Sequence, residues 1–176
     1  FTPGQWTQVA QQYQNAMEDL RRFELDILLN SPDKRDQALE KFATAVEVEP
    51  DNYTLLVAYA NLMESKDIDQ AIQLYDRAIQ VDPSNTTAYF NAGALEINKA
   101  VPIMEKANEA ADMAASMELQ NQAMDCYRKA RPYFEKVYEI KPNDLQVLQA
   151  LQQITISLGD TEAYQKYKAA ADALNN

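Results

Sequence analysis

The sequence contains no histidine, one cysteine (Cys126) and only three glycines (Gly4, Gly93 and Gly159) in 176 residues. Without histidine there is no Ser-His-Asp or Cys-His catalytic unit, and no histidine ligand for zinc, copper or haem. Three scattered glycines do not form a phosphate-binding loop, which needs clustered glycines so that backbone amides reach the phosphates. A single cysteine forms neither an internal disulfide nor a Cys-x-x-Cys centre. We therefore expect no catalysis, no cofactor and no metal site.

Positive charge is also scarce, with 16 Lys and Arg against 27 Asp and Glu and a formal net charge of −11. Nucleic acids and anionic membranes are poor partners for such a chain, because binding them requires clustered basic residues. No apolar run is long enough to span a bilayer. Residues 125–176 hold seven acidic and seven basic residues, so the whole net charge lies in residues 1–124. That acidic part is either a solubilising surface or a surface that steers a basic or neutral protein partner.

Three proline residues stand in the same sequence context. Pro50, Pro83 and Pro142 each follow an apolar-periodic segment and precede Asn or Asp residues that can cap the next helix. Upstream of each proline the same spacing of small and aromatic residues recurs: Ala38, Phe42 and Ala45; Ala71, Tyr75 and Ala78; Ala130, Phe134 and Val137. Pro50 and Pro83 are 33 residues apart, a period typical of a solenoid with two helices per unit.

These residues resemble the tetratricopeptide repeat (TPR) family, whose unit reads W-x2-L-G-x2-Y, then A-x3-F, then P. In the third unit Tyr89, Ala92 and Gly93 occupy the W, L and G places, and Glu96 stands where the family has Tyr. The first-helix places of the second unit are filled by Leu56, Tyr59, Ala60 and Met63. The resemblance implies an all-α fold, a right-handed TPR-like solenoid of about four helix-turn-helix units in a single domain, residues 1–176. The expected units are about 5–50, 53–83, 86–142 and a closing unit at 145–174, and whether residues 1–30 form a regular repeat stays open.

The third unit contains an insertion near residues 100–127. From Glu96 to Ala130 there are 34 residues where the family has 9, and the stretch between Asn98 and Arg128 contains no glycine and only Pro102 as a proline. Its abundant Ala, Glu and Met favour helix. We therefore expect both helices of this unit to be lengthened into a protruding hairpin that turns near Asp112 to Met117.

Four of the six methionines lie in this predicted hairpin: Met104, Met113, Met117 and Met124. Three interpretations stay open. The methionines fill a narrow helix–helix seam between alanines, or they form an adaptable apolar contact surface for a partner or a second copy. The third, a thioether copper(I) site, is disfavoured because no histidine or second cysteine accompanies the sulfur atoms.

The TPR resemblance also implies a concave groove lined by the first helix of each unit, which in the family commonly binds extended peptides. The corresponding residues here are Thr54, Val57, Asn61, Glu64, Thr87, Phe90, Asn91, Ala94, Gln146, Gln149 and Gln153. Asn61 and Asn91 stand at asparagine places, but no Lys or Arg accompanies them, which argues against the carboxylate clamp of one TPR subclass. The groove is either a polar, amide-rich binding wall or an unused solvated surface.

Two functions follow as hypotheses. The leading one is a non-catalytic scaffold or adaptor that binds a protein or peptide through the groove, the hairpin or both. The alternative is a structural module that self-associates into a homo-oligomer through its Met/Ala-rich hairpin. The segment Lys129 to Lys136 resembles helices of exported bacterial TPR proteins, and on that resemblance we expect a bacterial cell-envelope or periplasmic location rather than a cytoplasmic one.

Overall fold

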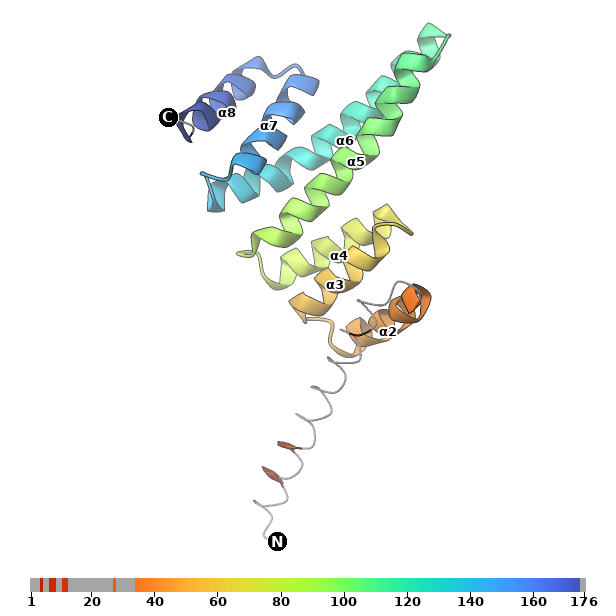
Figure 1. Cartoon of the computed structure of the whole chain (residues 1–176), viewed down its shortest axis with the longest axis vertical. Helices are drawn as coiled ribbons and strands as arrows, with labels where there is room; N and C mark the ends of the chain where they lie inside the picture. The colour runs from red at the N-terminus through yellow and green to blue at the C-terminus, as the bar shows by residue number, and fades with distance from the viewer. Residues whose placement is uncertain (1–3, 5–6, 9–10, 13–26, 28–33, 175–176) are drawn as a thin grey trace.

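The computed structural model describes residues 34–174, together with residues 4, 7, 8, 11, 12 and 27. Residues 34–174 form an elongated stack of antiparallel helices and contain no strand (Figure 1). The helices are α2 (Arg35–Val48), α3 (Tyr53–Met63), α4 (Ile68–Val81), α5 (Thr86–Glu109), α6 (Met113–Ile140), α7 (Leu145–Ser157) and α8 (Thr161–Leu174). The predicted all-α, TPR-like helical solenoid is confirmed. Much of the first predicted unit, residues 5–50, lies outside the described residues.

Capping side chains fix where the helices begin. Asn52, Asp67, Asn85 and Asp144 each precede a helix, and each accepts a hydrogen bond from a backbone N–H in its first turn. Such bonds satisfy donors that have no partner inside the helix. Helices α2, α4 and α6 each end two residues before a proline, at Pro50, Pro83 and Pro142, as the sequence predicts.

Each helix packs mainly against its neighbours in sequence, from α2 on α3 through to α7 on α8. The buried side chains form two clusters. One joins α2, α3, α4 and the beginning of α5; the other joins the rest of α5 with α6, α7 and α8. Helix α5 belongs to both clusters, so it connects the two halves of the stack.

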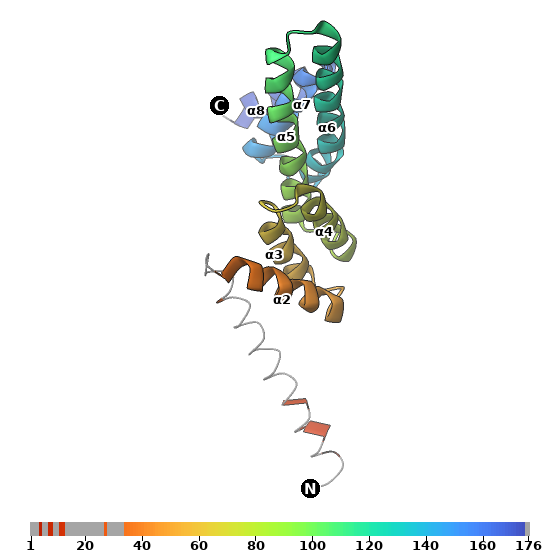
Figure 2. The same ribbon diagram turned by 90° about the vertical axis from the view of Figure 1, so that its right-hand side faces the viewer.

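The insertion lengthens both helices of the third unit, as expected. Helix α5 has 24 residues and α6 has 28, and the pair projects beyond its neighbours in both views (Figures 1 and 2). The turn lies at residues 110–112, earlier than the expected Asp112 to Met117. Asp112 Oδ2 accepts a hydrogen bond from the backbone N–H of Ala115, at 3.0 Å, so Asp112 caps α6 and the helix begins at Met113.

Candidate functional site

The predicted groove residues lie on α3, α5 and α7 and divide by exposure. Those that are exposed are Thr54, Asn61, Thr87, Gln146, Gln149 and Gln153. Those that are half-buried are Val57, Glu64, Phe90, Asn91 and Ala94. The exposed set consists entirely of hydroxyl and amide side chains. This surface therefore offers hydrogen-bond donors and acceptors without charge.

Three of these residues meet around the phenol of Tyr75, on α4. The Tyr75 Oη atom is hydrogen-bonded to Asn61 Oδ1 and lies 2.6 Å from Glu64 Oε1. Asn91 Nδ2 donates to Tyr75 Oη at 3.2 Å and to Asn61 Oδ1 at 3.5 Å. We call Asn61, Glu64, Tyr75 and Asn91 the amide network. It joins α3, α4 and α5 and reaches the surface at the exposed Asn61.

The phenol of Tyr75 is held in its neutral form. Burial raises its pKa well above the ordinary value, and the hydrogen bond to Glu64 and the negative charge of Glu64 raise it further. The single phenol proton serves one of its two acceptors, Asn61 or Glu64, at a time. Asn61 and Glu64 therefore share one donor, the Tyr75 hydroxyl, and one of these acceptors, Asn61, is exposed at the surface.

The sequence analysis assigned no site role to Tyr75. The residue stands at the same repeat position as Phe42 and Phe134, and all three rings are buried. The signal was the hydroxyl group: of these three rings only Tyr75 carries one, and a buried phenol needs a hydrogen-bond partner.

The half-buried apolar residues of the predicted groove are packing residues. Phe90 contacts Phe134 edge to face, with ring centroids 5.4 Å apart. Val57 and Ala94 also pack against the two buried clusters. Phe90 is therefore held by its own chain, and the exposed members of the set are all polar.

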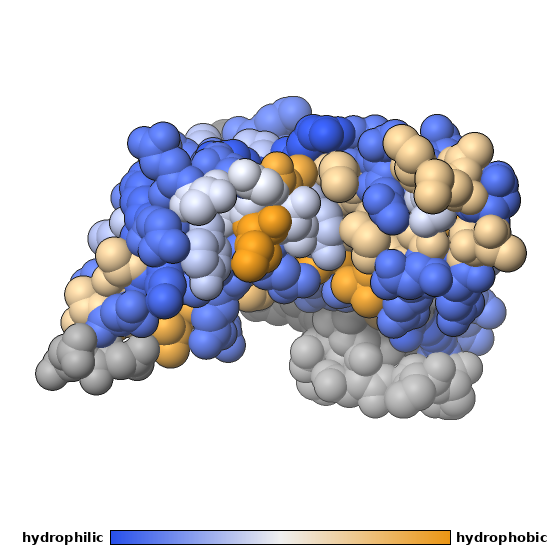
Figure 3. Space-filling model, turned by 90° about the horizontal axis from the view of Figure 1, so that it is seen from above, coloured by the Kyte–Doolittle hydropathy of each residue, from blue (hydrophilic) through white to orange (hydrophobic). Residues whose placement is uncertain are grey.

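The four hairpin methionines do not share one environment. Met113 and Met117 are 79% and 59% exposed, while Met104 and Met124 are half-buried. Three alanines, Ala100, Ala107 and Ala123, fill the buried seam between α5 and α6 instead. Figure 3 looks down on this end of the molecule and shows moderately hydrophobic, pale orange side chains gathered at its right, over the end of the hairpin. The seam interpretation is therefore wrong for Met113 and Met117.

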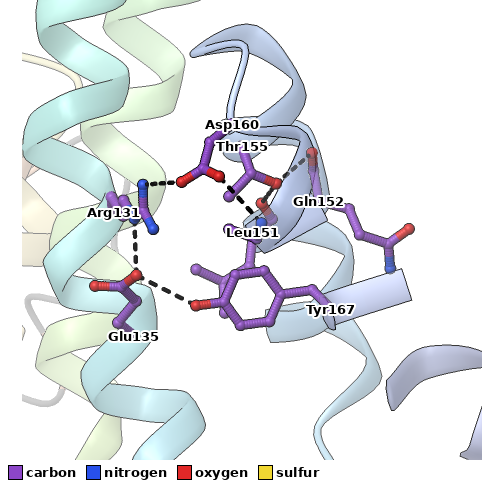
Figure 4. A network of polar contacts seen from close by, with 8 residues as sticks. Arg131, Glu135, Leu151, Gln152, Thr155, Asp160 and Tyr167 are labelled. Atoms are coloured by element: carbon purple, nitrogen blue, oxygen red, sulfur yellow. Dashed lines mark hydrogen bonds and ion pairs between the residues drawn. The ribbon is translucent and has the colours of Figure 1, made fainter. Parts of the chain in front are cut away.

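A second polar cluster attaches the last helix pair to α6 (Figure 4). Arg131 donates to Glu135 Oε1 at 2.7 Å and to Asp160 Oδ2 at 2.9 Å. Tyr167, on α8, donates to the same Glu135 oxygen at 3.2 Å. Burial and the adjacent Glu135 raise the pKa of Tyr167 to about 12. All four side chains are used in binding one part of the fold to another, so we assign them a structural role.

Glu96, at the family's Tyr place, is 5% exposed, and its Oε2 atom has no hydrogen-bond partner. The nearest cation is Lys99, whose Nζ lies 3.7 Å from that oxygen and 2.5 Å from Asp69 Oδ1. Cys126 is buried nearby, and burial raises the pKa of its thiol above the ordinary value. A thiol with a raised pKa is a poor nucleophile, so Cys126 has the character of a core side chain.

In the described part of the chain, no group of three or more Cys, Asp or Glu residues is arranged to hold a metal ion. No helix among the described residues combines the length and the apolar character needed to cross a membrane.

The described helices form a helical repeat solenoid, and this architecture defines the fold class of the described residues. Residues 60–96 match the family model described as TPR repeat. That match, on this stack of helix pairs, supports a tetratricopeptide repeat assignment for this part of the chain. The assignment supports a general role as a protein-interaction scaffold. Comparison with curated proteins found no match.

Among solved structures, the chain is similar to a monomeric mutant of IFIT1 with Gppp-AAAA, at 17% identity and a TM-score of 0.51. That alignment covers 78% of this chain and 36% of the IFIT1 chain, so the chain spans about a third of IFIT1. MamA from residue 41 to the end, from Desulfovibrio magneticus RS-1, aligns at 18% identity with a TM-score of 0.44. It covers 89% of this chain and 94% of the MamA chain. At these identities the IFIT1 likeness concerns the fold alone.

Proposed function

We propose that this protein is a non-catalytic scaffold that binds an extended peptide across α3, α5 and α7. The observation that carries the proposal is the amide network, in which Asn61, Glu64 and Asn91 converge on Tyr75. Asparagine amides offer both donors and acceptors, so they can bond a peptide backbone that has left water. The network holds these amides in place before a partner arrives, which lowers the entropy lost on binding.

The charge of the groove residues selects among peptides. Glu64 is the one charged residue of the eleven, and no Lys or Arg is among them. A carboxylate in a partly buried site favours a cationic or neutral group and repels an acidic one. The peptide is therefore neutral or basic. The net charge of −11 opposes binding of a phosphate-rich ligand such as the Gppp-AAAA in the IFIT1 structure.

An array of peptides of about 12 residues, long enough in the extended conformation to span several groove positions, tests this proposal. The double variant Asn61→Ala/Asn91→Ala removes both amides from the network while the buried Tyr75 ring stays. The matched control is Gln73→Ala/Gln80→Ala, which removes two exposed amides from α4. We expect the array pattern of the control to match that of the wild type, and the network variant to lose its neutral and basic peptides. An unchanged pattern in the network variant contradicts groove binding.

The second candidate function is self-association through the hairpin, and the exposure of Met113 and Met117 is the observation that favours it. Sedimentation equilibrium at high micromolar concentration tests it. A dimer that Met117→Glu dissociates would support self-association, and a monomer at every concentration would contradict it.

A further inference from the structure

One stripe of side chains runs along the whole length of α6. Its members follow one another at spacings of three, four or seven residues, so they lie on one flank of the helix. They are Met113, Met117, Gln120, Met124, Arg131, Glu135 and Tyr138. We call this set the α6 stripe. Its C-terminal half is polar and aromatic, and its N-terminal half is mainly methionine.

The C-terminal half of the α6 stripe is covered by the α7–α8 pair. Arg131 is bonded to Asp160 in the α7–α8 turn, Glu135 accepts from Tyr167, and Tyr138 contacts the Tyr167 ring with centroids 5.5 Å apart. Helix α7 has 13 residues and α6 has 28. Asp160 is bonded to Arg131, so about 18 residues of α6 precede this contact and extend past the α7–α8 turn, roughly 27 Å at the helical rise.

The N-terminal half of the same stripe is more open than the C-terminal half. Met113 and Met117 are exposed, and Gln120 and Met124 are half-buried. Figures 1 and 2 show the hairpin continuing past α7 and α8. The flank of α6 that packs against α7 and α8 in its C-terminal half thus continues as an apolar flank in its N-terminal half. This apolar flank suits the packing of another helix along it.

Charge indicates which kind of helix fits. The segment 100–125 holds five acidic residues and one basic residue, Lys106, a net charge of −4. The acidic residues are Glu105, Glu109, Asp112, Glu118 and Asp125. Below it, residues 128–141 hold five basic and two acidic residues, a net charge of +3. The segment that holds the open half of the α6 stripe is therefore acidic, and the segment that holds the covered half is basic.

We infer that the open half of the α6 stripe binds an amphipathic helix of a partner protein, with apolar residues on one face and Lys or Arg beside them. Methionine side chains adapt to the shape of an incoming apolar face. The net charge of −4 on segment 100–125 attracts the cations of the partner helix and speeds the encounter. A second copy of this chain fits less well, because two hairpins of charge −4 repel each other. The inference goes beyond the proposed function, and it does not depend on the groove.

A designed helical peptide is a direct probe. It carries Leu at positions a and d of two heptads and Lys beside them; a second peptide replaces each Lys by Glu. Fluorescence anisotropy measures the binding of each labelled peptide to the full chain. The test variant is Met113→Glu/Met117→Glu, and the control is Ala115→Glu, which adds an acidic side chain at an exposed position between the two methionines in sequence but off the stripe.

The added glutamates distinguish binding through apolar contacts with the methionines from binding through electrostatic attraction alone. If the peptide sits on the methionines, the test variant binds the Lys peptide about tenfold or more weakly despite its extra negative charge. Ala115→Glu then binds it as well as the wild type does, and the Glu peptide binds to none of them. Equal or tighter binding by Met113→Glu/Met117→Glu overturns the inference, as does a wild-type dimer whose dissociation these glutamates cause. Variants of the amide network should leave this binding unchanged, so failure here and failure of groove binding are distinguishable.

Discussion

The Phe134 ring lies directly on Gly93. A Cβ atom added at Gly93 would be 2.7 Å from Phe134 Cε2 and 3.2 Å from Tyr133 Cβ. Phe134 is 1% exposed and also contacts Phe90 edge to face, so the ring has little room to move. Gly93 therefore sets how closely α5 approaches α6, at the place where the hairpin leaves the stack.

Gly93→Ala is expected to lower the free energy of unfolding by about 1–3 kcal/mol through overpacking. This loss is net of a helix-propensity gain of roughly 1 kcal/mol from replacing glycine. Urea denaturation followed by circular dichroism measures it. In the double variant Gly93→Ala/Phe134→Leu the smaller side chain makes room, so the two losses should not add. Additive losses would show that the ring is not what excludes the methyl group.

Gly159 has a different role. Its φ of +72° is a left-handed conformation that favours glycine, and no heavy atom lies within 4 Å of an added Cβ. Gly159→Ala should cost about 1–2 kcal/mol of stability through left-handed backbone strain alone. Gly159→Asn should cost less, since asparagine adopts this conformation more readily. Thermal unfolding of both variants checks the order, and equal losses would contradict it.

Alkaline pH should destabilise the fold from about pH 10 upwards. The pKa values of Tyr75, Tyr133 and Tyr167 are all raised in the folded chain, mainly by burial and then by adjacent carboxylates. Above the ordinary tyrosine pKa of 10.0 the unfolded chain loses these protons while the folded chain keeps them, so stability falls as pH rises. Below that pH both states hold the protons and the tyrosines contribute no pH dependence.

Melting temperatures between about pH 8 and about pH 11 measure this effect. Tyr75→Phe removes one of the titrating groups, so its melting temperature should fall less steeply with pH than that of the wild type. Its stability at neutral pH should also be lower, because Asn61 and Glu64 lose a hydrogen-bond partner. A slope identical to that of the wild type would show that Tyr75 titrates normally.

Glu96→Met should leave stability unchanged or raise it by about 1 kcal/mol, because a buried carboxylate oxygen without a hydrogen bond is costly to desolvate. Lys99 keeps its ion pair with Asp69 in this variant, so no charge is left without a partner. Chemical denaturation measures the change. A loss of more than about 2 kcal/mol would mean that Glu96 and Lys99 form a net stabilising pair.

The fold followed from the sequence because its signals are local. Proline stops, capping Asn and Asp residues and the small–aromatic spacing each act within one or two helical turns, and they gave the helix pairs directly. The hairpin was foreseen from composition, but its turn was misplaced because alanines and methionines on both sides favour helix equally. The capping bond to Asp112 decided it.

The candidate site was less predictable, because it depends on contacts between units. The repeat register predicts Asn61, Glu64 and Asn91 as groove residues, whereas it predicts their common hydrogen-bond partner, Tyr75, as a core residue. The Tyr75 ring is in the core, but its hydroxyl group bonds residues of neighbouring helices, and the sequence alone does not show those contacts. The repeat register predicts that Phe90 faces the groove, but its ring packs against Phe134 of α6. Helix periodicity alone does not distinguish such a ring from a free one.

The central claim, that Asn61 and Asn91 meet a partner, is tested most directly by two-dimensional NMR of the isotope-labelled chain. The side-chain NH2 signals of the two asparagines are followed while the best neutral or basic peptide from the array is added. The account predicts that both signals shift in step with binding, while those of Gln73 and Gln80 on α4 stay in place. Saturating binding that leaves the signals of Asn61 and Asn91 unmoved would contradict it.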